Sequence, residues 1–285
     1  MANFLLVFDV GGTHIRAIHL VEGEQKELIK TAHGKFDSFL EWLKNSPVYG
    51  LKADQVVIAA AGPKEGEGLR MTNLHWFFDQ QELEKFFKCP VLLLNDLEAA
   101  VHLLPNVDPV VSLQGTPSKG IRALITPGTG LGEAFILPRD GKWFAMPMES
   151  GQTLYTPTID VGKKAVRLEE LLSGSGLSLI HKTLTGQQLI PEEVGAIGGE
   201  TVHYFLELLL QEAQQVALRI LPMGGIFFGG AIVRALSPIL QKIGIETFYR
   251  HPTMEEMLKK IPLLIIPSKD IVLQGAILAA KEESK

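Results

Sequence analysis

Phe4-Leu5-Leu6-Val7-Phe8-Asp9-Val10-Gly11-Gly12-Thr13 is the stretch of sequence that decides the fold. Its apolar half has the length and the composition of a buried strand, and a carboxylate stands where this strand ends. The two glycines allow a sharp turn and let backbone N–H groups come close to an anion.

The residues that follow this turn alternate between apolar and polar from 14 to 21, so the turn joins two strands of a hairpin. A dinucleotide-binding fold would place such glycines before a helix, and a Walker loop would end in Gly-Lys-Ser or Gly-Lys-Thr. Neither pattern is present. From these residues alone, an anion-binding turn and a hairpin that needs glycine only for its geometry are equally good interpretations.

Length and composition limit the classes of protein to consider. The 285 residues suffice for two domains or one large α/β domain, and 46% hydrophobic with 21% charged residues is typical of a globular protein. No apolar run reaches the ~18 residues of a membrane span, and a net charge of -5 with scattered basic residues disfavours nucleic acid. Cys89 is the only cysteine, which excludes an internal disulfide and a cysteine zinc cluster. With a first strand that starts at the N-terminus, we expect a cytoplasmic protein without membrane or nucleic-acid partners.

A second candidate site follows the apolar residues 90–94, which predict a buried parallel strand. Asn95 and Asp96 come directly after it, and the next residues have helical composition. Open α/β sheets bind ligands at the carboxyl ends of parallel strands. A cap of the following helix explains the same pair equally well, and both roles can coexist.

The pattern of the N-terminus recurs in the second half of the chain. Gly128-Thr129-Gly130-Leu131-Gly132 lies between predicted strands at 121–126 and 133–137. Two such hairpins facing each other across a cleft could hold a polyphosphate. Gly229-Gly230 follows another buried strand and opens a helix, which admits a flat ring or a phosphate but is also a simple tight turn. Residues 166–172, which include Glu169 and Glu170, predict a helix, as do 200–221 and 271–280.

The joint order of these motifs, together with Glu149 and Leu172-Ser173-Gly174, resembles bacterial-type glucokinases of the actin, hexokinase and Hsp70 ATPase superfold. The resemblance implies an α/β, two-domain actin-like ATPase (ribonuclease H-like) fold with mixed sheets and an interdomain cleft. The expected domains are 1–104 plus 268–285 and 105–267, with a hinge near 103–108. The related group of repressors and kinases with a cysteine-rich zinc loop is disfavoured, because Cys89 stands alone.

The resemblance also implies a function, the ATP-dependent phosphorylation of a hexose, with glucose converted to glucose 6-phosphate. Asp96 would be the catalytic base, and Asp9 would hold Mg²⁺ through water. A small-molecule sugar is the expected partner, and a homodimer is left open. The implied sugar-binding residues are Asn95, Asp96, Glu149, Gln152 and Glu169, with Glu170 as the substitute for Glu169. The implied ATP-binding residues are Asp9, Gly11, Gly12, Thr13, Gly128, Thr129, Gly130, Gly229 and Gly230.

Two departures from the family pattern leave alternatives open. The family's Glu-Gly-Gly-His is Glu149-Ser150-Gly151-Gln152 here, so a side chain that can carry charge is replaced by one that can only hydrogen-bond. Ala231 also replaces a glycine of the adenosine turn. A kinase for another hexose, a donor other than ATP, and a sugar or nucleotide sensor without turnover therefore remain alternatives.

Overall fold

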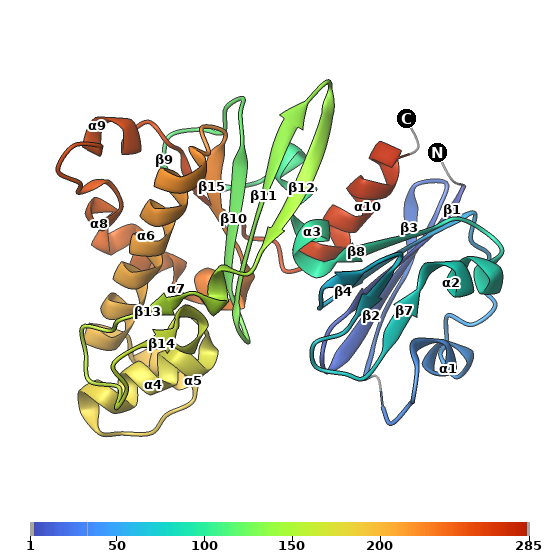
Figure 1. The fold of residues 1–285 in the computed structure, drawn as a ribbon, viewed down its shortest axis with the longest axis horizontal. Helices are drawn as coiled ribbons and strands as arrows, with labels where there is room; N and C mark the ends of the chain where they lie inside the picture. The colour runs from blue at the N-terminus through green and yellow to red at the C-terminus, as the bar shows by residue number, and fades with distance from the viewer. Residues whose placement is uncertain (1–2, 33, 284–285) are drawn as a thin grey trace. The chain divides into compact units, whose positions relative to one another are not determined.

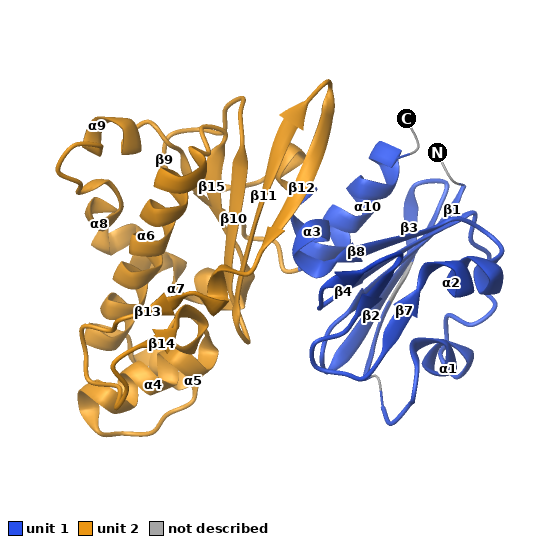
Figure 2. Cartoon of the chain, viewed as in Figure 1, with its two compact units in different colours: residues 1–103, 270–285 blue, residues 104–269 orange. Residues whose placement is uncertain are grey.

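The computed structural model describes residues 3–32 and 34–283. The chain forms two compact units, one of Met1–Leu103 with Asp270–Lys285 and one of Leu104–Lys269, called unit 1 and unit 2 below (Figure 2). Whether these units are the independently folding domains expected at 1–104 plus 268–285 and 105–267 stays a prediction.

Unit 1 is built on a five-stranded mixed sheet with the order β3-β2-β1-β4-β8 (Figure 1). The first hairpin supplies the antiparallel pairs, and β1, β4 and β8 run parallel to one another. The predicted hairpin around Gly11 is therefore present. The strands are β1 (Phe4–Val10), β2 (His14–Val21), β3 (Glu24–Ala32), β4 (Gln55–Ala60) and β8 (Val91–Asn95).

Both faces of this sheet are covered, which explains why β1 is a continuous apolar run rather than an alternating one. Leu6 and Phe8 pack into one core, whereas Leu5 and Val7 pack into the core on the other face. The first core contains α1 (Phe39–Lys44), α2 (Gln80–Phe87) and a small sheet of β5 (Lys64–Glu65), β6 (Gly68–Arg70) and β7 (Phe77–Asp79). The second contains α3 (Asp96–Val101) and α10 (Ile271–Glu283).

Helix α10 packs closely on α3 at Gly275. A methyl group at this position would overlap the carbonyl oxygen of Ala99. The contact ties the C-terminal segment to the helix that begins at Asp96.

Unit 2 repeats the arrangement of unit 1 with a six-stranded sheet of order β12-β11-β10-β15-β16-β9. An antiparallel hairpin again leads into parallel strands, because β10 pairs antiparallel with β11 and parallel with β15. The strands are β9 (Val111–Gln114), β10 (Arg122–Pro127), β11 (Leu131–Arg139), β12 (Lys142–Met148), β15 (Gly225–Phe228) and β16 (Leu263–Ile265).

The helices of unit 2 surround α6 (Gly199–Ile220), whose apolar stripe, including Phe205 and Leu209, is buried in the core (Figure 1). The other helices are α4 (Gly174–Thr185), α5 (Pro191–Ile197), α7 (Gly230–Ile243), α8 (Glu246–Tyr249) and α9 (Glu255–Leu258), with short 3₁₀ turns at Leu104–Asn106, Ser150–Gln152 and Leu168–Glu170. Among the described residues, no helix has the length and apolar character needed to cross a membrane.

The helix predicted at 166–172 is wrong. The segment is a short strand, β14 (Val166–Arg167), followed by the 3₁₀ turn Leu168–Glu170. Strand β14 pairs with β13 (Leu154–Tyr155), and the N–H of Leu168 donates to the carbonyl of Thr153 at 2.9 Å. These backbone groups find partners in another segment, which local helical propensity cannot foresee.

Candidate active site

Asp9, Asn95 and Asp96 lie at one edge of the unit 1 sheet. The register pairs Val10 with Ala60 and Ala60 with Asn95, so the carboxyl ends of β1, β4 and β8 are level. This is the edge at which open α/β sheets place ligands.

Asp9 is nearly buried, with 8% of its surface exposed, and is paired with a cation. Arg16 stands directly opposite on β2 and donates from Nε to Oδ2 of Asp9 at 2.8 Å. Arg16 also contacts Asp270 at 2.6 Å. Burial raises the pKa of Asp9 above its ordinary value, and the charge of Arg16 offsets part of that increase. We did not predict Arg16, although counting back across the hairpin from Gly11 places it beside Asp9.

The first glycine turn is tight. The N–H of Gly11 donates to the carbonyl of His14 at 3.0 Å, so Gly11 serves the turn itself. A methyl group on Gly12 would lie only 3.3 Å from Cβ of Asn73, whereas Thr13 is exposed. Of these three residues, Thr13 is therefore the one whose side chain is accessible to a ligand.

Asn95 caps helix α3, and the capping interpretation of this residue is correct. Its Oδ1 accepts hydrogen bonds from the N–H groups of Leu97 at 2.9 Å and Glu98 at 3.3 Å. Its Nδ2 donates to the carbonyl of Gly62 at 2.9 Å. Asp96 is the first residue of α3 and is half-buried, and its Oδ1 accepts from the N–H of Leu97 at 3.0 Å. The helix start thus holds the Asp96 carboxylate in a defined orientation.

Three glycine motifs that are distant in sequence meet around the second hairpin, in unit 2. The N–H of Gly174, at the start of α4, donates to the carbonyl of Gly128 at 2.8 Å. Gly229 donates to Ile125 at 3.0 Å, and Gly230 has a φ of +90°. A Cβ on Gly230 would lie 2.9 Å from the carbonyl of Pro127, so both backbone conformation and space require glycine there.

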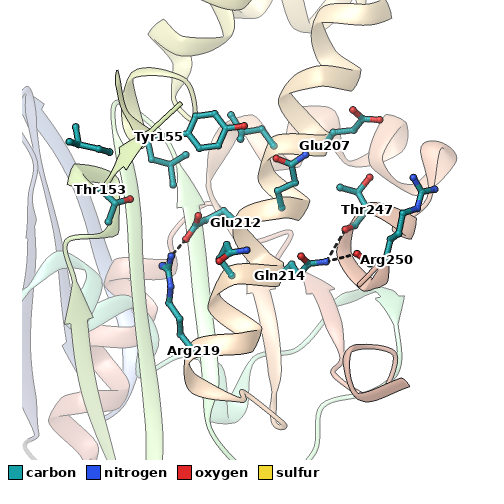
Figure 3. Close-up of a pocket in the computed structure, with 13 residues that line it drawn as sticks. Thr153, Tyr155, Glu207, Glu212, Gln214, Arg219, Thr247 and Arg250 are labelled. Atoms are coloured by element: carbon teal, nitrogen blue, oxygen red, sulfur yellow. Dashed lines mark hydrogen bonds and ion pairs between the residues drawn. The ribbon is translucent and has the colours of Figure 1, made fainter. Parts of the chain in front are cut away.

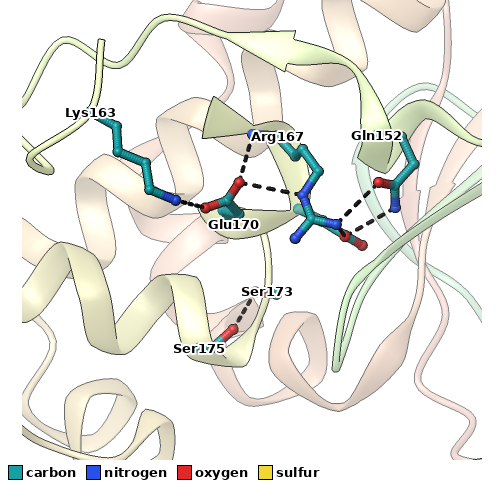
Figure 4. A network of polar contacts seen from close by, with 7 residues as sticks. Gln152, Lys163, Arg167, Glu170, Ser173 and Ser175 are labelled. Atoms are coloured by element: carbon teal, nitrogen blue, oxygen red, sulfur yellow. Dashed lines mark hydrogen bonds and ion pairs between the residues drawn. The ribbon is translucent and has the colours of Figure 1, made fainter. Parts of the chain in front are cut away.

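Glu169 lies against the tip of this hairpin, held by Gln152 and Arg167, which Figure 4 labels. A Cβ on Gly130 would lie 2.7 Å from Oε2 of Glu169. Gln152 donates to Oε1 of Glu169 at 3.0 Å and accepts from Arg167 at 3.2 Å, while Arg167 pairs with Oε1 of Glu169 at 2.8 Å. We did not predict Arg167. Gln152 therefore contacts both Glu169 and Arg167, the cation that pairs with Glu169.

Glu170 shares Arg167 with Glu169, because Nε of Arg167 lies 3.4 Å from Oε1 of Glu170. Its carboxylate pairs with Lys163 at 2.7 Å and accepts from the N–H of Arg167 at 3.1 Å. The hydrogen bond from Lys163, followed by that from the Arg167 backbone, lowers the pKa of Glu170 to about 2. Glu169, not Glu170, lies at the hairpin tip.

Glu149 is exposed and directly precedes the 3₁₀ turn Ser150–Gln152. A Cβ on Gly151 would lie 2.8 Å from the carbonyl of Leu131, so this loop packs against the second hairpin. Gln152, Glu169 and Gly130 are thus gathered in unit 2, with Glu149 at the start of the same loop.

Asp9 is the carboxylate of the candidate site that is expected to hold Mg²⁺ through water. Within residues 3–32 and 34–283 there is no group of three or more His, Cys, Asp and Glu side chains that could hold a metal. Mg²⁺ commonly keeps several waters and takes only one or two carboxylates together with phosphate oxygens. A single carboxylate such as Asp9 is consistent with that mode of binding.

The family model for glucokinase matches residues 6–283 of this chain. A glucokinase of Chromobacterium violaceum is 31% identical over 95% of this chain and 87% of its own length, and one of Caulobacter vibrioides is 29% identical over 98% and 96%. Among solved structures, glucokinase from an Antarctic psychrotroph has a TM-score of 0.82 at 23% identity, covering 99% of both chains. The predicted actin-like ATPase fold class is confirmed. The chain belongs to the glucokinase family.

Proposed function

We propose that this enzyme transfers the γ-phosphoryl group of ATP to the C6 hydroxyl of a hexose, with glucose as the preferred substrate and Asp96 as the base. ATP-dependent phosphorylation by a hexose kinase is the activity of its family, as predicted, and the sensor alternative is not favoured. The observation that supports the assigned residues is the level placement of Asp9, Asn95 and Asp96 at one sheet edge.

Asp96 accepts the proton of the sugar hydroxyl as the oxygen attacks the γ-phosphorus and ADP leaves. Phosphoryl transfer requires mainly alignment and stabilisation of charge on the phosphoryl oxygens. A general base typically contributes 10²–10⁴-fold to the rate. Because Oδ1 of Asp96 accepts from the N–H of Leu97, the orientation of the carboxylate is set before substrate binds.

Sugar recognition is assigned to Asn95, Glu149, Gln152 and Glu169. An ionised carboxylate accepts hydrogen bonds from several hydroxyl groups, which suits a pyranose ring. The contacts of Gln152 and Arg167 with Glu169 keep this carboxylate in place before sugar binds, so less side-chain entropy is lost on binding.

Nucleotide binding is assigned to the two glycine hairpins and to Gly229 and Gly230. When Mg²⁺ is bound, it neutralises charge on the phosphates, and Asp9 would orient its water ligands. We include in the proposal a closure step that excludes water from the reaction.

The test is an assay of ADP release with purified chain, ATP, Mg²⁺ and a panel of glucose, mannose, fructose, glucosamine and N-acetylated sugars. We expect the highest kcat/KM with glucose. If no sugar stimulates ADP release, the kinase proposal fails. If another hexose gives a higher kcat/KM than glucose, and Gln152→His makes glucose the preferred substrate, then the glutamine in place of histidine in this loop determines the substrate.

A further inference from the structure

Unit 2 contains a pocket of ≈ 670 Å³ that holds none of the residues assigned to the active site. Helix α6 forms one wall, and β13 and the region around α8 contribute the others (Figure 3). Ligand-binding pockets in proteins range over about 300–1,000 Å³. The pocket is therefore large enough for a small molecule.

One wall is fixed by a hydrogen-bonded glutamine. Nε2 of Gln214 on α6 donates to the carbonyls of Phe248 at 2.8 Å and Thr247 at 3.3 Å, which anchors α8 to α6. Glu207, Gln211 and Gln215 follow one another at intervals of four along α6 and are exposed. They consequently lie on one helix face and offer both donors and acceptors.

The lining contains two arginines and two glutamates, so it carries no large excess of either charge. Arg219 pairs with Glu212 at 3.6 Å, and Arg250 pairs with Glu246 at 3.2 Å. Glu212 has only 7% of its surface exposed, and its Oε1, the atom of this ion pair, makes no hydrogen bond. A hydrogen bond from a ligand or water would satisfy this atom more fully.

The lining also offers apolar surface to a ring. Leu154, which is 79% exposed, and the half-buried Tyr155 border the pocket among the polar groups, whereas Leu168 and Leu208 are nearly buried. A mixture of hydrogen-bonding groups and apolar surface matches a pyranose, which carries both hydroxyls and C–H groups. A strongly charged ligand finds no matching excess of opposite charge.

We propose that this pocket binds a neutral polyhydroxylated molecule of mono- to disaccharide size, in addition to the sugar at the active site. The pocket adjoins the sugar-binding segment, because its lining residues Thr153 and Leu168 directly neighbour Gln152 and Glu169. A backbone hydrogen bond of 2.9 Å joins Leu168 to Thr153. Occupancy of the pocket is thereby coupled to the spacing of Gln152 and Glu169.

The test is methyl NMR of the full chain with labelled leucine, titrated with glucose, maltose, sucrose and, as a charged probe, glucose 6-phosphate. We expect at least one neutral sugar to shift the signals of Leu154, Leu168 and Leu208. Gln211→Leu should weaken this binding about tenfold, as expected when one ligand hydrogen bond is lost. Gln241→Leu, at an exposed helical glutamine outside the pocket, is the matched control and should leave binding unchanged.

Three results would overturn the proposal. One is that no neutral sugar moves these signals, and another is that only glucose 6-phosphate does. The third is that the signals move with protein concentration alone, which would make the pocket a contact between copies of the chain. The readout needs no turnover, so failure of the kinase assay would leave its result intact.

Discussion

Glu133 makes the stability of unit 2 depend on pH, and Glu133→Gln should remove the part of that dependence that Glu133 contributes. The side chain is fully buried in β11, directly after the second hairpin, and neither carboxylate oxygen has a hydrogen-bond partner. Burial, together with the nearby charge of Glu212, raises the pKa of Glu133 from 4.5 to about 8.

The direction in which stability changes with pH follows from proton binding. Between pH 4.5 and 8 the folded state retains a proton that the unfolded state has released, so stability is highest at low pH and falls as pH rises. From pH 5 to pH 8, these two pKa values correspond to a loss of about 3–4 kcal/mol, an upper limit because water entry reduces it. Glu212, whose pKa burial raises to about 7, acts in the same direction.

Urea unfolding at several pH values, followed by circular dichroism, measures this contribution. The difference in unfolding free energy between Glu133→Gln and wild type should grow in favour of the variant by up to about 3–4 kcal/mol between pH 5 and pH 8. Glu192→Gln, which removes an exposed carboxylate of the same unit, should keep the wild-type profile. Parallel curves of unfolding free energy against pH for wild type and Glu133→Gln would refute the reasoning, because the pKa of Glu133 would then be the same in the folded and unfolded states.

Three further substitutions test individual contacts. Gly275→Ala should destabilise unit 1 by about 1–3 kcal/mol, because the added methyl overlaps the carbonyl of Ala99, and an unchanged Tm would contradict that packing. Asn95→Ala should cost about 0.5–2 kcal/mol in urea unfolding through loss of the helix cap, whatever its effect on sugar binding, and full stability would show that the cap is dispensable. Gly130→Ala should displace the Glu169 carboxylate and raise KM for the hexose about tenfold, and an unchanged KM would separate Glu169 from the sugar.

Much of the fold could be predicted because its main strands are apolar runs that end in recognisable turns. The run from Phe4 and the glycine turn at Gly11 specify a hairpin by local chemistry alone. The small sheet β5–β7 was missed, because its strands are only two or three residues long and carry no periodicity. The segment from Val166 was misread because its hydrogen-bond partners lie in β13.

The candidate site was predicted less completely than the fold. The motifs point to Asp96 and the glycine turns as candidates, but not to the cations that hold the acidic residues. Strand register places Arg16 opposite Asp9, and the 3₁₀ turn after Arg167 brings this arginine to Glu169. Residue types alone do not reveal either contact. The buried Glu133 is likewise visible only once α6 and β11 are packed together.

The most direct test of the account is the turnover of Asp96→Asn beside its affinity for glucose. Asparagine keeps the size and the contact with the N–H of Leu97 but is a far weaker base than a carboxylate. We predict a fall in kcat of about 10²–10⁴-fold with a glucose Kd that stays within about threefold of wild type, measured by ADP release and by calorimetry. A variant that turns over glucose at the wild-type rate would contradict the assignment of Asp96 as the base.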